Sequence, residues 1–311
     1  MATLKELSKK EELFSGGHRL CSGCGIPPII RLVLRTYDTP VVAANATGCL
    51  EVATTVYPYT AWRIPWIHSA FENSAATISG VETAYRAFKK KGKIPADKTI
   101  KFIAFGGDGG TYDIGLQSLS GALERGHNFL YLCYDNGAYM NTGVQRSSAT
   151  PFGSNTTTSP AGLVIKGKQE KRKDLTRIVV AHNVGYAAQA SPHNWSDLSK
   201  KAEKAINTTG PTFLNIVSAC PLGWYTKPAD SIELSKIAVD TCFWPLYEVD
   251  QGVLKITYKP KVKRPITDWL KPQGRFKHLF KPGTEGMIDE IQAQIDADWE
   301  RLLESDGKLV Y

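Results

Sequence analysis

The sequence predicts an α/β protein built on a doubly wound, mostly parallel sheet, followed by an extended C-terminal tail. Four short apolar runs, rich in β-branched and aromatic residues, are typical of strands buried on both faces. Three longer segments with helical patterns lie between them, and strands that alternate with helices indicate a parallel sheet. The expected strands are Pro40–Ala46, Ile100–Phe105, Phe129–Tyr134 and Phe213–Val217, and the expected helices are Ser69–Lys91, Asp113–Arg125 and Ser196–Ile206.

The individual elements have local signals as well. The first expected helix is rich in alanine and ends in lysines, which suit the negative end of a helix dipole. The second carries apolar residues at helical spacing. Between Thr142 and Lys173 the pattern gives way to Thr, Ser, Pro, Gly and Lys. A loop of this length in a compact domain is more often functional than not.

The sequence after residue 243 differs in character from the rest. It contains short extended segments, many prolines and basic residues, and a final helix expected near Met287–Leu303. We therefore expect one folded domain over residues 1–243 and an extended arm over residues 244–311 that packs on partner subunits.

Bulk properties exclude some classes of protein. A chain of 311 residues with 42% hydrophobic residues can bury a sizeable core. The net charge of +8 is spread along the chain, without the interleaved basic and aromatic residues of a nucleic-acid-binding module. An acidic electron-transfer protein is a possible partner for such a surface. No apolar segment is long enough to span a membrane, so we expect a cytoplasmic protein with reduced cysteines.

Four of the six cysteines lie in small, turn-like surroundings. Cys21 and Cys24 form a C-x-x-C pair beside glycines, while Cys49 and Cys220 each follow an expected strand. By spacing alone, this set is compatible with a [4Fe–4S] cluster, a zinc site or no metal. Cys133 lies inside an expected strand and Cys242 precedes two aromatic residues, so both are expected to be structural.

The segment Phe105–Ile114, FGGDGGTYDI, is an expected strand followed by a glycine-rich turn and a helix. It matches neither of the common nucleotide-binding fingerprints. Its bare backbone can approach a diphosphate, and Asp108 can bind a bridging Mg²⁺ ion. Asn136 follows Gly109 after 26 intervening residues, so one strand–helix–strand step returns its amide to the same sheet edge. Each motif alone could be an ordinary turn, but together they indicate one site.

This pair resembles the GDG…N motif of thiamine diphosphate enzymes. Over roughly residues 13–280 the chain resembles the β subunit of pyruvate:ferredoxin oxidoreductase, within the 2-oxoacid:ferredoxin oxidoreductase family. The matching segments are GHRLCSGCG, NATGCLEV, YPYTAWRIPWIHSAFEN, SACPLGW, WPLYEVDQG and the whole stretch from GGDGG to SSATP. The resemblance implies the sheet of the thiamine diphosphate-binding type and favours the [4Fe–4S] cluster over zinc.

The resemblance also assigns roles to individual residues. Asp108, Asn136 and the carbonyl of Ala138 should hold Mg²⁺, and Asn141 should lie close to the substrate as a catalytic candidate. Further contacts to the cofactor should come from Thr47, Gly48, Gly107, Gly109 and Thr142. The cluster ligands should be Cys21, Cys24, Cys49 and Cys220.

One position departs from the typical family pattern. Members commonly read DNEAY, and this chain has Gly137 in place of the glutamate. Without a carboxylate beside it, the active site would repel a dianion such as oxalate less strongly. Neutral drift at a turn position that suits glycine explains the change equally well.

The function implied by the resemblance is thiamine-dependent oxidative decarboxylation of a 2-oxoacid, either pyruvate with coenzyme A or oxalate. The cofactor takes up the electrons left by CO₂ loss, and the cluster passes them toward ferredoxin. An α subunit should supply the aminopyrimidine glutamate and most substrate contacts, because neither Glu51 nor Glu72 matches that role. Gamma and ferredoxin-like subunits or domains should carry further clusters. Two alternatives remain: a non-redox thiamine diphosphate-dependent decarboxylase subunit, and a zinc-stabilised assembly subunit.

Overall fold

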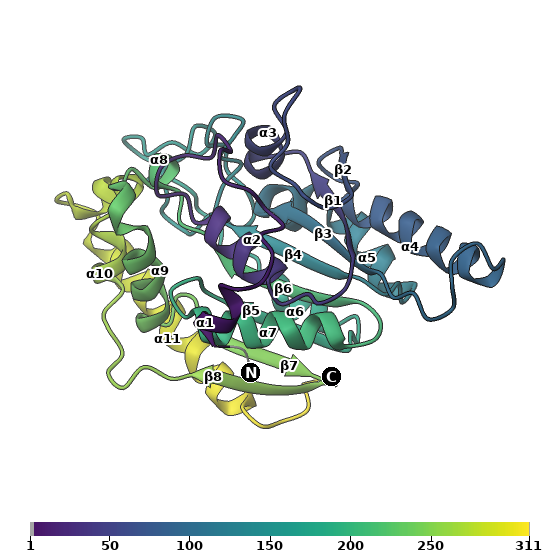
Figure 1. Cartoon of the computed structure of the whole chain (residues 1–311). Helices are drawn as coiled ribbons and strands as arrows, with labels where there is room; N and C mark the ends of the chain where they lie inside the picture. Colours follow the sequence, from purple (N-terminus) through teal and green to yellow (C-terminus); the bar gives the residue numbers. More distant parts are fainter. Residues whose placement is uncertain (1–2, 311) are drawn as a thin grey trace.

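The computed structural model describes residues 3–310, apart from the side chain of Glu285, and its centre is one sheet of eight strands. The strand order is β2-β1-β3-β4-β6-β5-β7-β8 (Figure 1). The first six strands in this order run parallel, while β7 and β8 are antiparallel to their neighbours. Their bounds are β1 Val41–Ala46, β2 Trp66–Ser69, β3 Lys101–Gly107, β4 Leu130–Asp135, β5 Tyr186–Ala190, β6 Thr212–Val217, β7 Leu246–Asp250 and β8 Val253–Tyr258.

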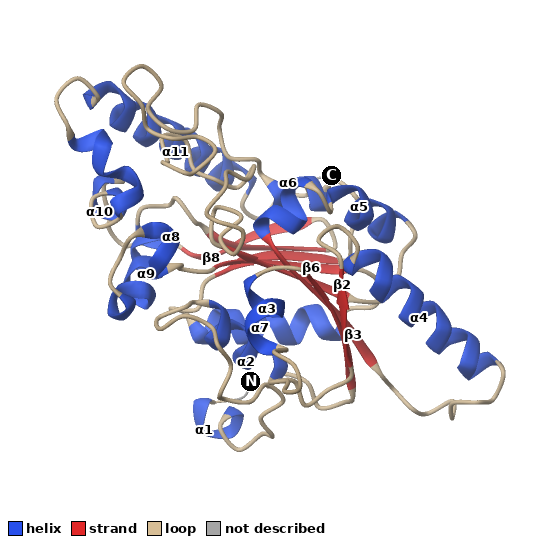
Figure 2. Ribbon diagram, turned by 90° about the horizontal axis from the view of Figure 1, so that it is seen from above, coloured by secondary structure: helices blue, strands red, loops and turns tan. Residues whose placement is uncertain are grey.

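Helices cover both faces of the sheet, as Figure 2 shows with the sheet seen on edge. One face is covered by α2 (Ile26–Leu34) and α7 (Trp195–Asn207), whose apolar residues join the first core cluster. The other face is covered by α4 (Ser74–Lys90), α5 (Leu116–Glu124) and α6 (Leu175–Val180). The predicted doubly wound, mostly parallel α/β fold is therefore confirmed.

The remaining helical segments lie at the ends of the sheet or in the C-terminal region. A third core cluster joins the end of β6 to this region through large side chains such as Trp224, Trp244 and Trp269. The bounds are α1 Leu4–Leu7, α3 Cys49–Thr54, the π-helix η1 Gly109–Asp113, α8 Pro221–Trp224, the 3₁₀ helix η2 Pro228–Asp230, α9 Ser231–Asp240, α10 Thr267–Leu270, the 3₁₀ helix η3 Gly274–Phe280 and α11 Glu285–Ser305.

The four expected strands and the three expected helices are all present, with shifted ends. The helix expected from Ser69 begins at Ser74, because Ser69 belongs to the edge strand β2. The helix expected from Asp113 begins with the π-helical turn η1 and becomes α-helical only at Leu116. Neither β2 nor β5 was predicted, and the alanine-rich sequence of β5 carries little β-propensity.

The C-terminal segment is folded onto the same chain rather than extended away from it. β7 pairs with β5 and β8 pairs with β7, so residues 246–258 extend the main sheet. The boundary at residue 243 therefore does not end the sheet. Packing of residues 244–311 on a partner subunit stays a prediction.

Candidate active site and cysteine cluster

The loops that follow the carboxyl ends of β1, β3 and β4 meet around a small cavity of about 30 Å³. In an open parallel sheet this edge is where ligands bind. The cavity brings together ten residues that the sequence analysis singled out: Thr47, Gly48, Cys49, Gly107, Asp108, Gly109, Asn136, Ala138, Asn141 and Thr142. Phe71, Gly110, Tyr134, Tyr139 and Met140 complete its wall.

The glycine-rich turn after β3 packs too closely against tyrosines to accept side chains. A Cβ on Gly109 would lie 2.3 Å from Cδ1 of Tyr139, and one on Gly106 would lie 2.3 Å from the Tyr131 hydroxyl. The Tyr139 hydroxyl donates a hydrogen bond of 2.9 Å to the Gly109 carbonyl, which fixes the two loops together. Glycine is therefore required here by close packing, and the backbone remains bare on the cavity side.

Three oxygen atoms converge beside this turn. The side-chain oxygen of Asn136 lies 2.9 Å from the carbonyl oxygen of Ala138 and 2.9 Å from Oδ1 of Asp108, with no donor between them. Rotating the amide would place its NH₂ group toward both acceptors. A cation between the three oxygens would satisfy them equally well, and oxygen is the ligand that Mg²⁺ prefers.

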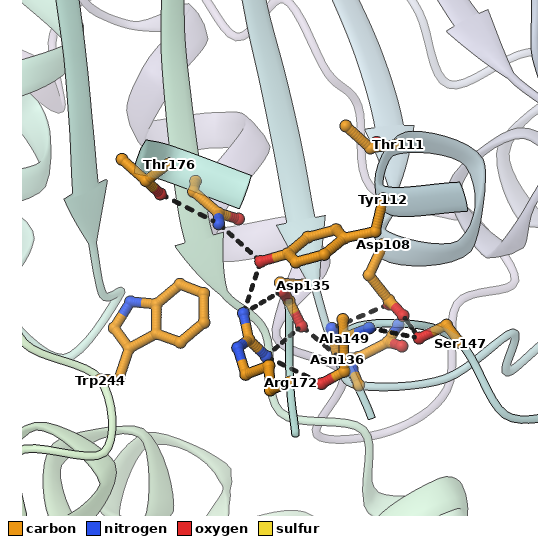
Figure 3. Close-up of polar contacts among 12 residues, drawn as sticks. Asp108, Thr111, Tyr112, Asp135, Asn136, Ser147, Ala149, Arg172, Thr176 and Trp244 are labelled. Carbon is orange, nitrogen blue, oxygen red and sulfur yellow. Dashed lines mark hydrogen bonds and ion pairs between the residues drawn. The ribbon is translucent and has the colours of Figure 1, made fainter. Parts of the chain in front are cut away.

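Asp108 is buried, and its hydrogen bonds come from uncharged groups. Ser147 Oγ donates to Oδ2 at 2.5 Å and the Asn136 N–H donates to Oδ1 at 3.3 Å (Figure 3). Burial, followed by the nearby charge of Asp135, raises the pKa of Asp108 to about 8. This carboxylate therefore gains from any cation that enters the cavity.

Asp135, the other buried carboxylate at this edge, is fully paired by a residue that sequence reasoning missed. Arg172 Nη2 lies 2.5 Å from Asp135 Oδ2 and also donates to the Tyr112 hydroxyl at 2.5 Å. Its Nη1 donates to the Ala149 carbonyl at 3.0 Å, and its guanidinium stacks on the Trp244 ring at 4.7 Å (Figure 3). Although burial opposes its charge, Asp135 holds the pKa of Arg172 above its usual value.

The long polar loop between Thr142 and Lys173 is ordered around this site. Lys168 is buried, and its ammonium group donates to the Thr150 carbonyl at 2.7 Å and to the Ser148 carbonyl at 3.3 Å. Lys173 donates to the Tyr112 carbonyl at 2.5 Å. In sequence these residues belong to a lysine-rich run, Lys166–Lys173. No local signal distinguishes a buried lysine in such a run.

The C-x-x-C loop is held against the loop that follows β6. The Gly25 N–H donates to the Ala219 carbonyl at 2.9 Å, and a Cβ on Gly23 would lie 2.3 Å from the Pro228 carbonyl oxygen. Both glycines therefore permit an approach that a larger residue would block. As a result, Cys21 and Cys24 come to lie beside Cys220, the N-cap of α8.

The four thiols act on one another electrostatically. Burial raises the pKa of Cys24 and of Cys49 to about 12, with further contributions from Cys220 and Cys21. Among the described residues, no three His, Cys, Asp or Glu side chains are placed to hold a single metal ion.

The other two cysteines are structural, as predicted. Cys133 is completely buried within β4, and Cys242 is buried after α9 in the third core cluster. Cys49 alone of the six also lines the small cavity. The expected ligand set is therefore continuous with the expected cofactor site.

Position 137 does not face the cavity. Gly137 has a φ of +79°, and a Cβ at this position would lie 3.1 Å from Nη1 of Arg275. The expectation that a carboxylate here would repel the substrate requires a side chain that points at the substrate. A Cβ at position 137 is directed toward Arg275 and position 137 does not line the small cavity, so the structure gives that expectation no support and it stays a prediction.

A second, larger cavity of about 930 Å³ lies between α11 and the sheet and has mostly apolar walls. Arg172 and Tyr112 line it as well, but none of the predicted cofactor or cluster residues does. The chemistry is therefore concentrated at the smaller cavity. Within residues 3–310, no helix is long and apolar enough to cross a membrane.

Comparisons with known proteins agree with this geometry. Residues 46–216 match the thiamine pyrophosphate enzyme family, C-terminal TPP binding domain. Pyruvate synthase subunit PorB of Thermotoga maritima is 54% identical over 303 residues, which cover 96% of this chain and 94% of that protein. PorB of Methanocaldococcus jannaschii is 50% identical, covering 92% and 95%.

Two other relatives widen the comparison. Ketoisovalerate oxidoreductase subunit VorB of Pyrococcus abyssi is 41% identical, covering 94% of this chain and 93% of that protein. The structure of 2-oxoglutarate:ferredoxin oxidoreductase from Magnetococcus marinus aligns with a TM-score of 0.55 at 19% identity, covering 73% of this chain and 81% of that chain, which shows a shared fold. The chain belongs to the thiamine pyrophosphate enzymes and, among these, to the family of pyruvate synthase subunit PorB.

Proposed function

We propose that this chain is the thiamine diphosphate-binding subunit of a multi-subunit 2-oxoacid:ferredoxin oxidoreductase that oxidises pyruvate. The observation that carries the proposal is the convergence of Asp108, Asn136 and Ala138 oxygens in a cavity that Cys49 also lines. The relatives named pyruvate synthase, at 54% and 50% identity, favour pyruvate as the substrate.

The spacing of the three oxygens supports Mg²⁺ as the bridging ion. Mg²⁺ binds octahedrally at about 2.0–2.1 Å, so ligand atoms at adjacent corners lie about 2.9 Å apart. One terminal atom of the Asn136 amide has this separation of 2.9 Å from both the Ala138 carbonyl oxygen and Asp108 Oδ1; with a cation bound it would be the amide oxygen, and without one the amide NH₂ can donate to both. Mg²⁺ would complete its coordination with diphosphate oxygens and water, and the bare turn at Gly107 and Gly109 leaves room for the diphosphate to approach.

The cysteines support a [4Fe–4S] cluster beside the cofactor. The residues fit the group: four thiols interact electrostatically, and two glycines let their loops meet closely. Cys21, Cys24, Cys49 and Cys220 would each bind one iron. Because Cys49 lines the same cavity as Asp108, electrons would have only a short distance to travel from the thiamine site.

Thiamine diphosphate, when bound, supplies the carbanion chemistry that removes CO₂ from a 2-oxoacid. The residues of this chain would hold the cofactor and close the loops around it. Asp108, Asn136 and Ala138 would hold the metal end of the cofactor, and the Tyr139 hydroxyl bonds the Gly109 carbonyl and so joins the two loops. Asn141, exposed on the cavity rim, would donate a hydrogen bond to the substrate.

Partner subunits complete the site. We propose that an α subunit supplies the aminopyrimidine glutamate, and that gamma and ferredoxin-like subunits carry electrons on to ferredoxin. Exposed apolar side chains support docking at the carboxyl edge of the sheet, where Figure 1 shows α3 and α8 at the same end. They lie in three segments that follow β1, β4 and β6, and include Tyr57, Tyr59, Leu163, Val164, Leu222 and Tyr225, all at least 59% exposed.

The test is anaerobic purification of the native complex, followed by assays for thiamine, iron and sulfide. Reduction of ferredoxin or viologen would then be measured with pyruvate, 2-oxoisovalerate and oxalate, with and without coenzyme A. We expect brisk reduction with pyruvate that requires coenzyme A. Oxalate oxidation without coenzyme A would instead identify an oxalate oxidoreductase.

The same preparation tests the other class of enzyme. A complex that binds thiamine diphosphate but shows no absorption at ~400 nm, where iron–sulfur proteins absorb, would be a non-redox decarboxylase. Zinc without iron would identify an assembly subunit. Either result would overturn the proposal.

A further inference from the structure

Arg275, in η3, is a buried cation without an acidic partner among the described side chains. It is 2% exposed, and its Nε donates to Gln273 Oε1 at 2.9 Å. The guanidinium is enclosed by the rings of Trp224, Trp269 and Phe276, at 4.5, 5.4 and 5.0 Å. Aromatic faces stabilise a buried cation only partly, so its charge is not neutralised within this shell.

The nearest carboxylates do not pair with it. Asp135 is already bound to Arg172 at 2.5 Å, and Asp108 lies in the cavity with Ser147 and Asn136. The position that faces Arg275 Nη1 is Gly137, which has no side chain. Burial lowers the pKa of Arg275 to about 9, so the group is still charged at neutral pH.

A continuous set of contacts connects this charge to the cysteine cluster. Trp224, on which the guanidinium stacks, is the last residue of α8 and donates through its backbone N–H to the Cys220 carbonyl at 2.8 Å. Its indole N–H donates to the Asn136 carbonyl at 2.7 Å. Arg275 and Cys220 favour each other's charged forms.

We propose that Arg275 is an electrostatic control on the cluster: its uncompensated positive charge stabilises the reduced cluster and raises the cluster's reduction potential. The inference rests on the proposed function, since it requires a [4Fe–4S] cluster on Cys220. A cluster held by four thiolates carries net negative charge, and one added electron makes that charge more negative by one unit. The iron–thiolate bonds are unchanged in this step. Because the reduced cluster carries the greater negative charge, a nearby fixed cation favours the reduced form.

The expected size follows from Coulomb's law. A unit charge at ~10 Å, acting through an effective dielectric of ~20, changes an equilibrium constant by about tenfold. For a one-electron couple, tenfold corresponds to about 59 mV. Loss of the charge should therefore shift reduction of this cluster to a potential lower by about that amount.

The experiment is an EPR-monitored redox titration of the intact, anaerobically purified complex. The signal of this cluster is identified as the component that Cys49→Ser removes. Arg275→Gln deletes the charge, and Arg275→Lys keeps it. Gly137→Glu places a carboxylate beside the guanidinium, and Gly137→Ala is its matched control, because both impose the same backbone strain at φ +79°.

We expect Arg275→Gln and Gly137→Glu to lower the equilibrium constant for reduction of the cluster roughly tenfold, and so to lower its reduction potential. Arg275→Lys and Gly137→Ala should leave the potential unchanged. Equal potentials in Gly137→Glu and Gly137→Ala would overturn the inference, and this pair decides the question if the arginine variants fail to assemble. A wild-type complex without iron would instead refute the proposed function.

Discussion

Two buried carboxylates, Asp135 and Asp108, lie at the same sheet edge, and their charges are balanced in different ways. Asp135 is bound by Arg172, which also bonds Tyr112 and Ala149, so that region is complete within the chain. Asp108 has only hydrogen bonds from Ser147 and Asn136, and its remaining neighbours are oxygens. A buried charge left without a counter-charge is costly, and this is why we propose that a bound ion completes the second region.

The largest expected effect comes from removing the incomplete carboxylate. Asp108→Ala should weaken Mg²⁺-dependent binding of thiamine diphosphate by at least about a hundredfold, because a metal ligand is lost. Isothermal titration of the apo complex would measure this. Asp113→Asn, which alters a carboxylate five positions further along in η1, is the matched control and should bind normally. Unchanged affinity in Asp108→Ala would show that no ion bridges at this position.

The same comparison extends to the cysteines. Four lie in the loops near Asp108, where we propose that bound groups complete the site, and two lie in the packed core. Cys21→Ser, Cys24→Ser, Cys49→Ser and Cys220→Ser should each lose the cluster assigned to this subunit. Cys133→Ser and Cys242→Ser should keep it, since both residues are buried in apolar core clusters and neither lines the small cavity. Iron and sulfide determination on the anaerobic complexes is the measurement. Retention of the full iron content in Cys49→Ser would refute the ligand assignment.

Disrupting the pair between Asp135 and Arg172 should lower the free energy of unfolding and should not weaken cofactor binding. Arg172→Met leaves Asp135 buried without its cation, and removal of one partner of a buried pair costs about 3–5 kcal/mol. Urea unfolding of the isolated protein or complex would measure the free energy. The control is Lys204→Met in α7, where loss of the partly exposed pairs with Glu248 and Asp250 of β7 should cost about 1 kcal/mol or less. Similar losses in both variants would contradict the comparison.

The smallest effect concerns Lys168, whose ammonium group is buried among carbonyls. Burial lowers its pKa from 10.5 to about 8, so the folded state gives up this proton at lower pH than the unfolded chain. Its contribution to stability therefore rises as the pH increases from about 8 to about 10.5, by up to about 3 kcal/mol. Urea midpoints at pH 7 and 10, in wild type and in Lys168→Gln, would reveal this rise as a difference between the two proteins. Parallel pH profiles would exclude it.

Much of the fold could be predicted because the signals are local. The apolar runs of β1, β3, β4 and β6 mark buried parallel strands, and the helices between them have their own periodicity. β5 has the sequence YAAQA and lacks that signal, since its place is decided by pairing with β6 and β7. β7 and β8, LYEVD and VLKITY, do carry β-branched and aromatic residues, but only their pairing with β5 and with each other shows that these extended segments belong to the main sheet.

The candidate site shows the same division. Asp108 and Asn136 could be paired from their separation, because parallel strands return to the same edge. The buried positions of Arg172, Lys168 and Arg275 could not be predicted, because a buried basic residue in a lysine-rich segment has the same local sequence as a solvated one. Gly137 shows the limit most clearly: its identity was evident, but the direction that a side chain would take was not.

The sequence by itself determined the fold class, the glycine-rich turn with Asp108 and Asn136, and the separation of four cysteines in turns from two in the core. These depend on local geometry and on spacing along the chain. Only the tertiary structure decided which charges are balanced. Asp135 is balanced by Arg172, whereas among the described side chains Asp108 has no cation and Arg275 no acid in an ion pair. The physical reason is that compensation of a buried charge depends on distances of a few ångströms between segments far apart in sequence.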